Sequence, residues 1–101
     1  MIRHIVMFEF AKEADGRNAI ENAVIAKDKL LSLPEKLPFI KRMEVGINDG
    51  DADDTNYTLC LTVDFDHMDD LRNYAIHPDH LEVAAFIGKV KIGRACVDYE
   101  I

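Results

Sequence analysis

The 101-residue sequence predicts an α+β fold in which a four-stranded antiparallel sheet has two helical segments on one face. Three observations lead to this prediction. Four short segments have the two-residue apolar period of strands, and two longer segments have the helical period. The segments follow one another in the order β-α-β-β-α-β. Two right-handed crossovers in this order give a ferredoxin-like sheet with both helices on the same side.

The first strand is expected at Ile2–Phe10. Successive residues of a strand point to opposite faces. Here both faces are apolar, because one contains Val6 and Phe8 and the other contains Ile5 and Met7. We assign the face of Val6 and Phe8 to the helices. The opposite face also needs a cover, since it is apolar as well.

A helix is expected from about Arg17 to Leu33, because apolar residues recur there at helical spacing. Side chains that can cap its first turn lie at positions 15–18. Pro34 and Pro38 are expected to end the helix, since the residue before a proline avoids helical geometry. A second strand is then expected around Ile40 to Ile47.

The C-terminal half predicts the remaining strands and the second helical region. Every second residue from Tyr57 to Phe65 is apolar, which predicts a strand with one apolar face. A helical region begins at about residues 66–70 and is expected to break at Pro78, which has no backbone N–H to donate. The last strand is expected from about Lys91 to Ile101. We expect residues 1–101 to form one domain.

The second face of the sheet has no predicted helix to cover it. It contains Ile5 and Met7 from the first strand and Thr58, Cys60 and Thr62 from the third. An apolar face of this kind needs a partner, and a symmetric copy is the simplest one. The sequence therefore predicts a homodimer in which two sheets pack face to face as a dimeric α/β barrel.

Charge and cysteine content exclude several classes of partner. Twelve basic and 19 acidic residues give a net charge of -7, which disfavours nucleic acid and anionic membrane surfaces. The sequence shows no export signal and no apolar run of the roughly 20 residues that span a bilayer, so we expect a cytoplasmic protein. Cys60 and Cys96 lie in apolar strands, where we expect buried free thiols.

Three side chains are candidates for acid/base chemistry: Tyr74 and His80 around the break at Pro78, and His4 on the helix-facing side of the first strand. A neutral imidazole in an apolar pocket can accept a proton, and a nearby phenol can donate to a carbonyl or enolate oxygen. The structural alternative stays open. In it, His4 is a hydrogen-bonded core residue and His77 caps a helix end.

No cofactor or metal is expected. A site formed by His4, His77 and His80 is disfavoured, because a proline separates two of these residues and no carboxylate lies at ligand spacing. The acidic segment Asp49–Asp54 has the beginning of a calcium-loop spacing, but Asp54 stands at position six, where glycine is required. We interpret this segment as a solvated turn, with weak divalent ion binding as the alternative.

Four segments together resemble the stress-responsive A/B barrel (Dabb) family of dimeric α+β barrel proteins. They are Ile2–Phe10, Met43–Gly46, Tyr74–His80 and Val97–Tyr99. The resemblance extends over essentially the whole chain. It implies the ferredoxin-like fold and the sheet-packed dimer, and it does not imply one activity, because fold does not dictate function.

The resemblance also implies roles for the candidate residues. Plant polyketide cyclases of the olivetolic acid cyclase type are similar, and their acid/base pair matches Tyr74 and His80. A further pocket histidine matches His4, whereas Leu59 stands where those cyclases have another histidine, so their polyketide substrate is not carried over. Two hypotheses follow: a cyclase-like enzyme, or a non-catalytic homodimer that binds a small apolar or carbonyl-containing ligand or serves as a structural stress-response protein. Haem binding ranks third.

Overall fold

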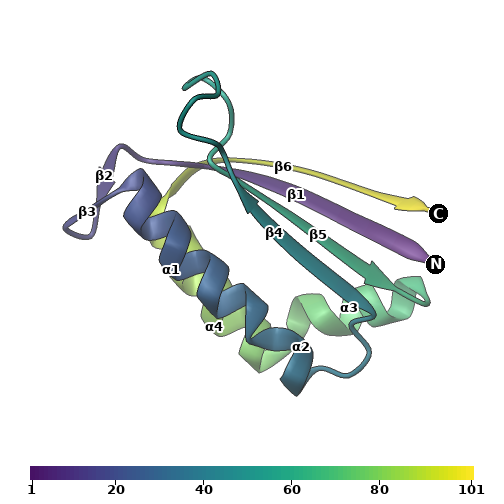
Figure 1. Cartoon of the computed structure of the whole chain (residues 1–101). Helices are drawn as coiled ribbons and strands as arrows, with labels where there is room; N and C mark the ends of the chain where they lie inside the picture. Colours follow the sequence, from purple (N-terminus) through teal and green to yellow (C-terminus); the bar gives the residue numbers. More distant parts are fainter.

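The computed structural model describes residues 1–101 and has the predicted order of the main elements (Figure 1). The elements are β1 (Ile2–Phe10), β2 (Glu13–Ala14), β3 (Arg17–Asn18), α1 (Ala19–Leu31), α2 (Leu33–Lys36), β4 (Arg42–Ile47), β5 (Leu59–Phe65), α3 (Met68–Ile76), α4 (Pro78–Val90) and β6 (Lys91–Glu100). The main sheet has the order β4-β5-β1-β6 and is antiparallel throughout. The ferredoxin-like α+β prediction is confirmed.

All helices lie on one face of the sheet (Figure 1), and the core fills the space between these two layers. Alternation places every second residue of β1 and β5 in this core, with Val6 directly opposite Leu61 in the strand pairing. Helix α1 contributes Ala23, Ala26 and Leu30 to the same core. None of the helices is long and apolar enough to cross a membrane.

Helix α1 begins at Ala19, two residues later than the sequence predicts. Asn18 is its N-cap, with its side chain accepting from the Glu21 N–H at 2.8 Å and the Glu21 side chain accepting from the Asn18 N–H at 3.0 Å. Capping within residues 15–18 is therefore confirmed. The β2–β3 hairpin that precedes the cap was not predicted. Asp15 and Gly16 form its turn with φ values of 55° and 78°, the geometry that Asp-Gly pairs favour.

Two of the predicted boundaries set by prolines need correction. Helix α1 ends at Leu31, and Pro34 lies inside the short helix α2 instead of ending the helical segment. A proline fits there because backbone N–H groups in the first helical turn have no intrahelical partner. Strand β4 begins at Arg42 and not at Ile40, since the Ile40 N–H donates to the Leu37 carbonyl in a turn at 3.0 Å.

Both cysteines are free thiols, but the prediction that they are buried is wrong. Cys96 is exposed and Cys60 is only partly buried. Cys60 lies on the sheet face that has no helix, directly opposite Met7 of β1. Cys96 lies on β6, which is an edge strand and has a neighbour on one side only. An apolar sequence context therefore does not guarantee burial at a sheet edge or on an open face.

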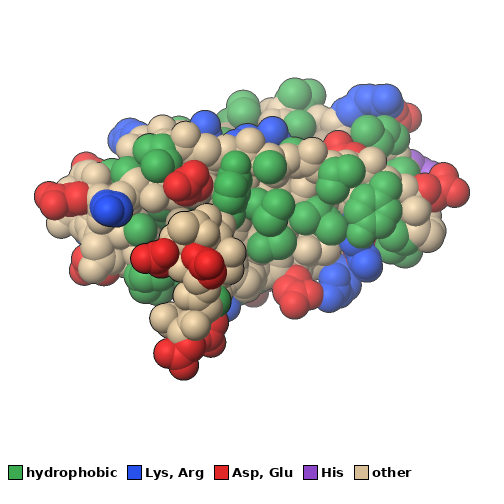
Figure 2. All heavy atoms as spheres, turned by 90° about the horizontal axis from the view of Figure 1, so that it is seen from above, with side chains coloured by type: hydrophobic (Ala, Val, Ile, Leu, Met, Phe, Trp, Pro, Cys, Tyr) green, Lys and Arg blue, Asp and Glu red, His purple; other side chains and the backbone are tan.

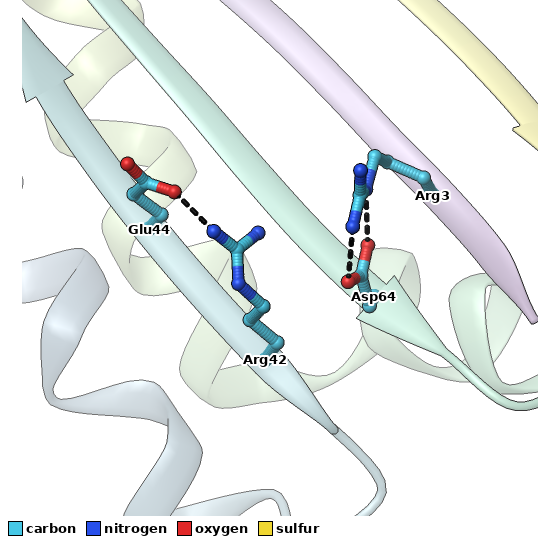
Figure 3. A network of polar contacts seen from close by, with 4 residues as sticks. All are labelled: Arg3, Arg42, Glu44 and Asp64. Carbon is cyan, nitrogen blue, oxygen red and sulfur yellow. Dashed lines mark hydrogen bonds and ion pairs between the residues drawn. The ribbon is translucent and has the colours of Figure 1, made fainter. Parts of the chain in front are cut away.

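The sheet face without helices is apolar at its centre and charged at one end. Figure 2 shows hydrophobic side chains gathered across this face. The strand pairing places Met7, Val97 and Tyr99 on this face, where they are 40%, 54% and 41% exposed. At the charged end, Arg3 forms a two-pronged ion pair with Asp64, with contacts of 2.8 and 2.9 Å (Figure 3). This hydrogen bonding lowers the pKa of the Asp64 carboxyl.

Candidate active site

His4, Tyr74 and His80 line one cavity of about 130 Å³ between the sheet and the helices. The ring centres of Tyr74 and His80 are 4.3 Å apart, and those of His4 and Tyr74 are 6.3 Å apart. Eight of the twelve residues that line the cavity are hydrophobic, so the polar groups face an apolar space. The structure thus brings together the three residues that the sequence selects. This convergence alone assigns them no catalytic role.

Local structure explains how residues far apart in sequence reach one cavity. His4 shares the helix-facing side of β1 with Val6 and is 8% exposed. Tyr74 lies near the end of α3, and His80 lies in the first turn of α4. Pro78 separates these helices as predicted, because proline is tolerated in the first turn of a helix but breaks the interior of one.

The hydroxyl of Tyr74 is buried and has no hydrogen-bond partner. The whole side chain is 1% exposed and packs against the ring of Phe65 at 5.3 Å between centres. Burial raises the pKa of the Tyr74 phenol well above its usual value. The hydroxyl therefore stays protonated at neutral pH, and it can act as a hydrogen-bond donor to a ligand oxygen.

His80 is held in one tautomer by the backbone. Its Nδ1 lies 3.1 Å from the carbonyl oxygen of Ala75, which can only accept, so Nδ1 bears the proton and Nε2 has the free lone pair. Burial lowers the pKa of His80 below its usual 6.5, the hydrogen bond to the Ala75 carbonyl opposes this, and the nearby His4, Arg94 and His77 lower the pKa further. The imidazole is therefore neutral at pH 7 and able to accept a proton at Nε2.

His4 is oriented by a carboxylate that the sequence reasoning missed. Its Nδ1 lies 2.5 Å from Oδ1 of Asp98, and the two residues are directly opposite in the β1–β6 pairing. The carboxylate accepts from Nδ1–H, which fixes the orientation of the His4 ring. Alternation along the last strand places Asp98 on the helix side, but its pairing with His4 depends on the register of two strands at opposite ends of the chain.

One group of side chains has the donor types of a metal site. The ring nitrogen of His4, the thiol of Cys96 and the carboxylate of Asp98 lie within 4.8 Å of one another. The His4–Asp98 separation is that of a hydrogen bond, so a metal ion could enter only if this pair opened. Partial burial of the sulfur, and then the nearby Asp98 carboxylate, raise the pKa of the Cys96 thiol and disfavour the thiolate that binds metals.

The other candidate residues from the sequence have local structural roles. His77 is the N-cap of α4 and accepts from the Asp79 N–H at 3.1 Å, so the capping interpretation is confirmed. His77 is also absent from the residues that line the cavity. In the acidic segment, Asp49 and Asp53 accept backbone N–H groups two residues further along, at 2.8 Å each. These bonds fit the solvated-turn interpretation.

The fold and the cavity together define the chain as a ferredoxin-like α+β domain with an apolar cavity between its two layers and an open apolar sheet face. More particularly, the chain belongs to the stress-responsive A/B barrel domain (Dabb) family, whose model matches residues 2–101. This confirms the family resemblance seen in the sequence. A search of curated proteins finds no match.

Solved structures of the same fold cover almost the whole chain. A protein of unknown function from Bacteroides fragilis, described as dimeric and ferredoxin-like, is 30% identical over 99% of this chain and 95% of its own, with a TM-score of 0.80. A similar dimeric protein from Thermobifida fusca is also 30% identical, over 99% and 90%, with a TM-score of 0.78. A hydroxynitrile lyase from Passiflora edulis is 19% identical over 99% and 92%, with a TM-score of 0.73, and shares the fold.

Proposed function

We propose that the protein is a homodimer whose cavity binds a small apolar carbonyl compound and transfers a proton at the carbon next to its carbonyl group. One observation contributes most to this proposal. Tyr74 lines an apolar cavity and its buried hydroxyl has no partner, and its ring centre lies 4.3 Å from that of His80, whose Nε2 is free. A buried hydroxyl without a partner is costly, and a ligand oxygen would satisfy it.

The proposed step uses only groups of this chain and needs no oxidant or reductant. Nε2 of His80 takes the proton from the carbon next to the carbonyl. The electrons of that C–H bond form a carbon–carbon double bond, and the carbonyl π electrons move to oxygen. Tyr74 donates a hydrogen bond to this oxygen, and His4, held by Asp98, orients the ligand. The enolate can then recover a proton or attack a second carbonyl, as in an aldol closure.

The open sheet face supports the homodimer. Its exposed apolar residues lie on adjacent strands, because Val97 of β6 is directly opposite Ile5 of β1, and Met7 follows two residues later on the same face. An apolar surface of this kind is usually covered by a partner. The two solved structures at 30% identity are described as dimeric. A second copy is therefore the cover that we propose.

A non-catalytic ligand-binding homodimer is the second candidate. The mostly apolar lining of the cavity favours it, because binding sites for small molecules are lined mainly by apolar side chains. In this case Tyr74 and His80 would fix the orientation of the ligand without transferring a proton. Binding alone cannot separate the two candidates, so the test must measure proton transfer.

Deuterium exchange tests the proposal directly. In D₂O, the wild-type protein should incorporate deuterium next to the carbonyl of small ketones such as cyclohexanone and acetophenone, followed by proton NMR. His80→Ala should remove most of this rate, because a positioned general base contributes roughly 10²- to 10⁴-fold. His67→Ala is the matched control, since His67 is exposed and lies outside the cavity.

The exchange rate should also depend on pH. The rate requires neutral His80, whose pKa lies below 6.5, so the rate should be constant around pH 7 and fall as the pH drops below the pKa of His80. If wild-type protein exchanges no faster than the His80→Ala protein, with ketones shown to bind, the binding proposal would replace the enzyme proposal.

A further inference from the structure

Two basic side chains lie at the same cavity as Tyr74 and His80. Lys91 and Arg94 both line it and are both exposed, so they lie where the cavity opens to solvent. Arg94 is also the one arginine of the chain without an ion pair. Each of the other four pairs with a carboxylate: Arg3, Arg17, Arg42 and Arg72. A cation left unpaired at a cavity mouth, in a chain of net charge -7, is available to a ligand anion.

A β-bulge brings the two cations to one side of the sheet. Arg94 is opposite Phe8 in the β1–β6 pairing, but Lys91 is opposite Phe10, so the register shifts by one and Ile92 is the extra residue. In a regular strand, residues three apart point to opposite faces. The bulge reverses this relation for Lys91, and both side chains therefore lie on the helix-facing side with the cavity.

We infer that the ligand of this cavity is a small apolar oxo acid, with its apolar body inside the cavity and its carboxylate at the mouth, bound by Arg94 and Lys91. This inference rests on the proposed function, because Tyr74 would bind the oxo group of the same ligand. The volume of the cavity limits the size of the apolar part of the ligand. A cavity of about 150 Å³ can hold benzene, and this one measures about 130 Å³.

A carboxylate fits these residues better than a phosphate group does. The planar guanidinium of arginine can bind a carboxylate or a phosphate through two parallel hydrogen bonds, so the other donors at the site must decide between the two anions. Phosphate sites usually add backbone N–H groups from a glycine-rich loop at a helix start, and the sequence has no such loop.

A pair of nearly isosteric probes tests the inference. Benzoate and benzamide differ in charge but hardly in shape, and each can be titrated into the dimer while amide resonances near the cavity are followed by NMR. Benzoate should bind at least about tenfold more tightly, because a hydrogen bond to a charged group is stronger than a neutral one. Arg94→Gln should remove this preference without weakening benzamide. Arg94→Lys should keep part of it.

Lys89→Gln is the matched control, because it also removes one exposed charge but lies outside the cavity. Equal affinity of wild-type protein for benzoate and benzamide, or a benzoate preference that Arg94→Gln and Lys89→Gln reduce equally, would overturn the inference. Tighter binding of phenyl phosphate than of benzoate would overturn it in favour of a phosphate ester. Deuterium exchange of neutral ketones does not involve Arg94, so its outcome reports on the proposed function separately.

Discussion

Replacing Tyr74 with phenylalanine should slow deuterium exchange by about 100-fold while leaving the free energy of unfolding unchanged or raising it. The rate should fall because the change deletes the donor that stabilises the developing oxyanion, and single donors of this kind contribute about 10²- to 10³-fold. Stability should not fall, because the hydroxyl has no partner in the folded chain. Leaving a buried hydroxyl unsatisfied costs about 1–3 kcal/mol, and phenylalanine avoids that cost.

Chemical denaturation and the exchange assay on the same preparation measure both effects. Tyr57→Phe is the control, because the Tyr57 side chain is exposed and does not line the cavity. It should change neither quantity. A Tyr74→Phe protein that loses about 1 kcal/mol or more would mean that the hydroxyl has a structural partner. The case for a ligand-facing donor would then be lost.

Placing a charge on the open sheet face should break the dimer. Val97 lies on this face opposite Ile5, and Val97→Asp would bury a carboxylate in each copy of a symmetric interface. Dimerisation should weaken by at least about 100-fold, since each 1.4 kcal/mol corresponds to a factor of ten. Light scattering should give twice the 11.5 kDa chain mass for wild type and the single-chain mass for the variant.

Leu81→Asp makes the same chemical change on the helical layer. Leu81 is 51% exposed and Val97 is 54% exposed, so the two positions are matched in residue type and exposure. Leu81→Asp should leave the dimer intact. If both variants stay dimeric, or if wild type has the single-chain mass at every concentration, the sheet face is not the interface.

The apolar periodicity of the sequence was sufficient to predict the fold and the convergence of His4, Tyr74 and His80. Alternation along β1 places His4 with Val6 on the helix side, and the proline at position 78 marks the break between Tyr74 and His80. Strand alternation and the helix break depend only on residues close together in sequence, so both can be predicted from the sequence alone. The same reasoning predicted the open apolar face.

Features that depend on strand register or on the sheet edge could not be predicted in this way. The contact of His4 with Asp98 requires the exact pairing of the first and last strands, and the position of Lys91 depends on one extra residue in that pairing. The exposure of Cys96 follows from the place of β6 at the sheet edge. An apolar sequence pattern indicates a strand, but it does not indicate which strands pair with it in the sheet.

A crystal structure of the protein with bound cyclohexanone would show whether Tyr74 and His80 contact the ketone as proposed. The ketone is close to benzene in size and fits the volume of the cavity. We expect its oxygen within about 3 Å of the Tyr74 hydroxyl and its neighbouring carbon about 3–3.5 Å from Nε2 of His80. An empty cavity at saturating ketone, or a carbonyl that points away from Tyr74, would show that Tyr74 is not the donor to a ligand oxygen.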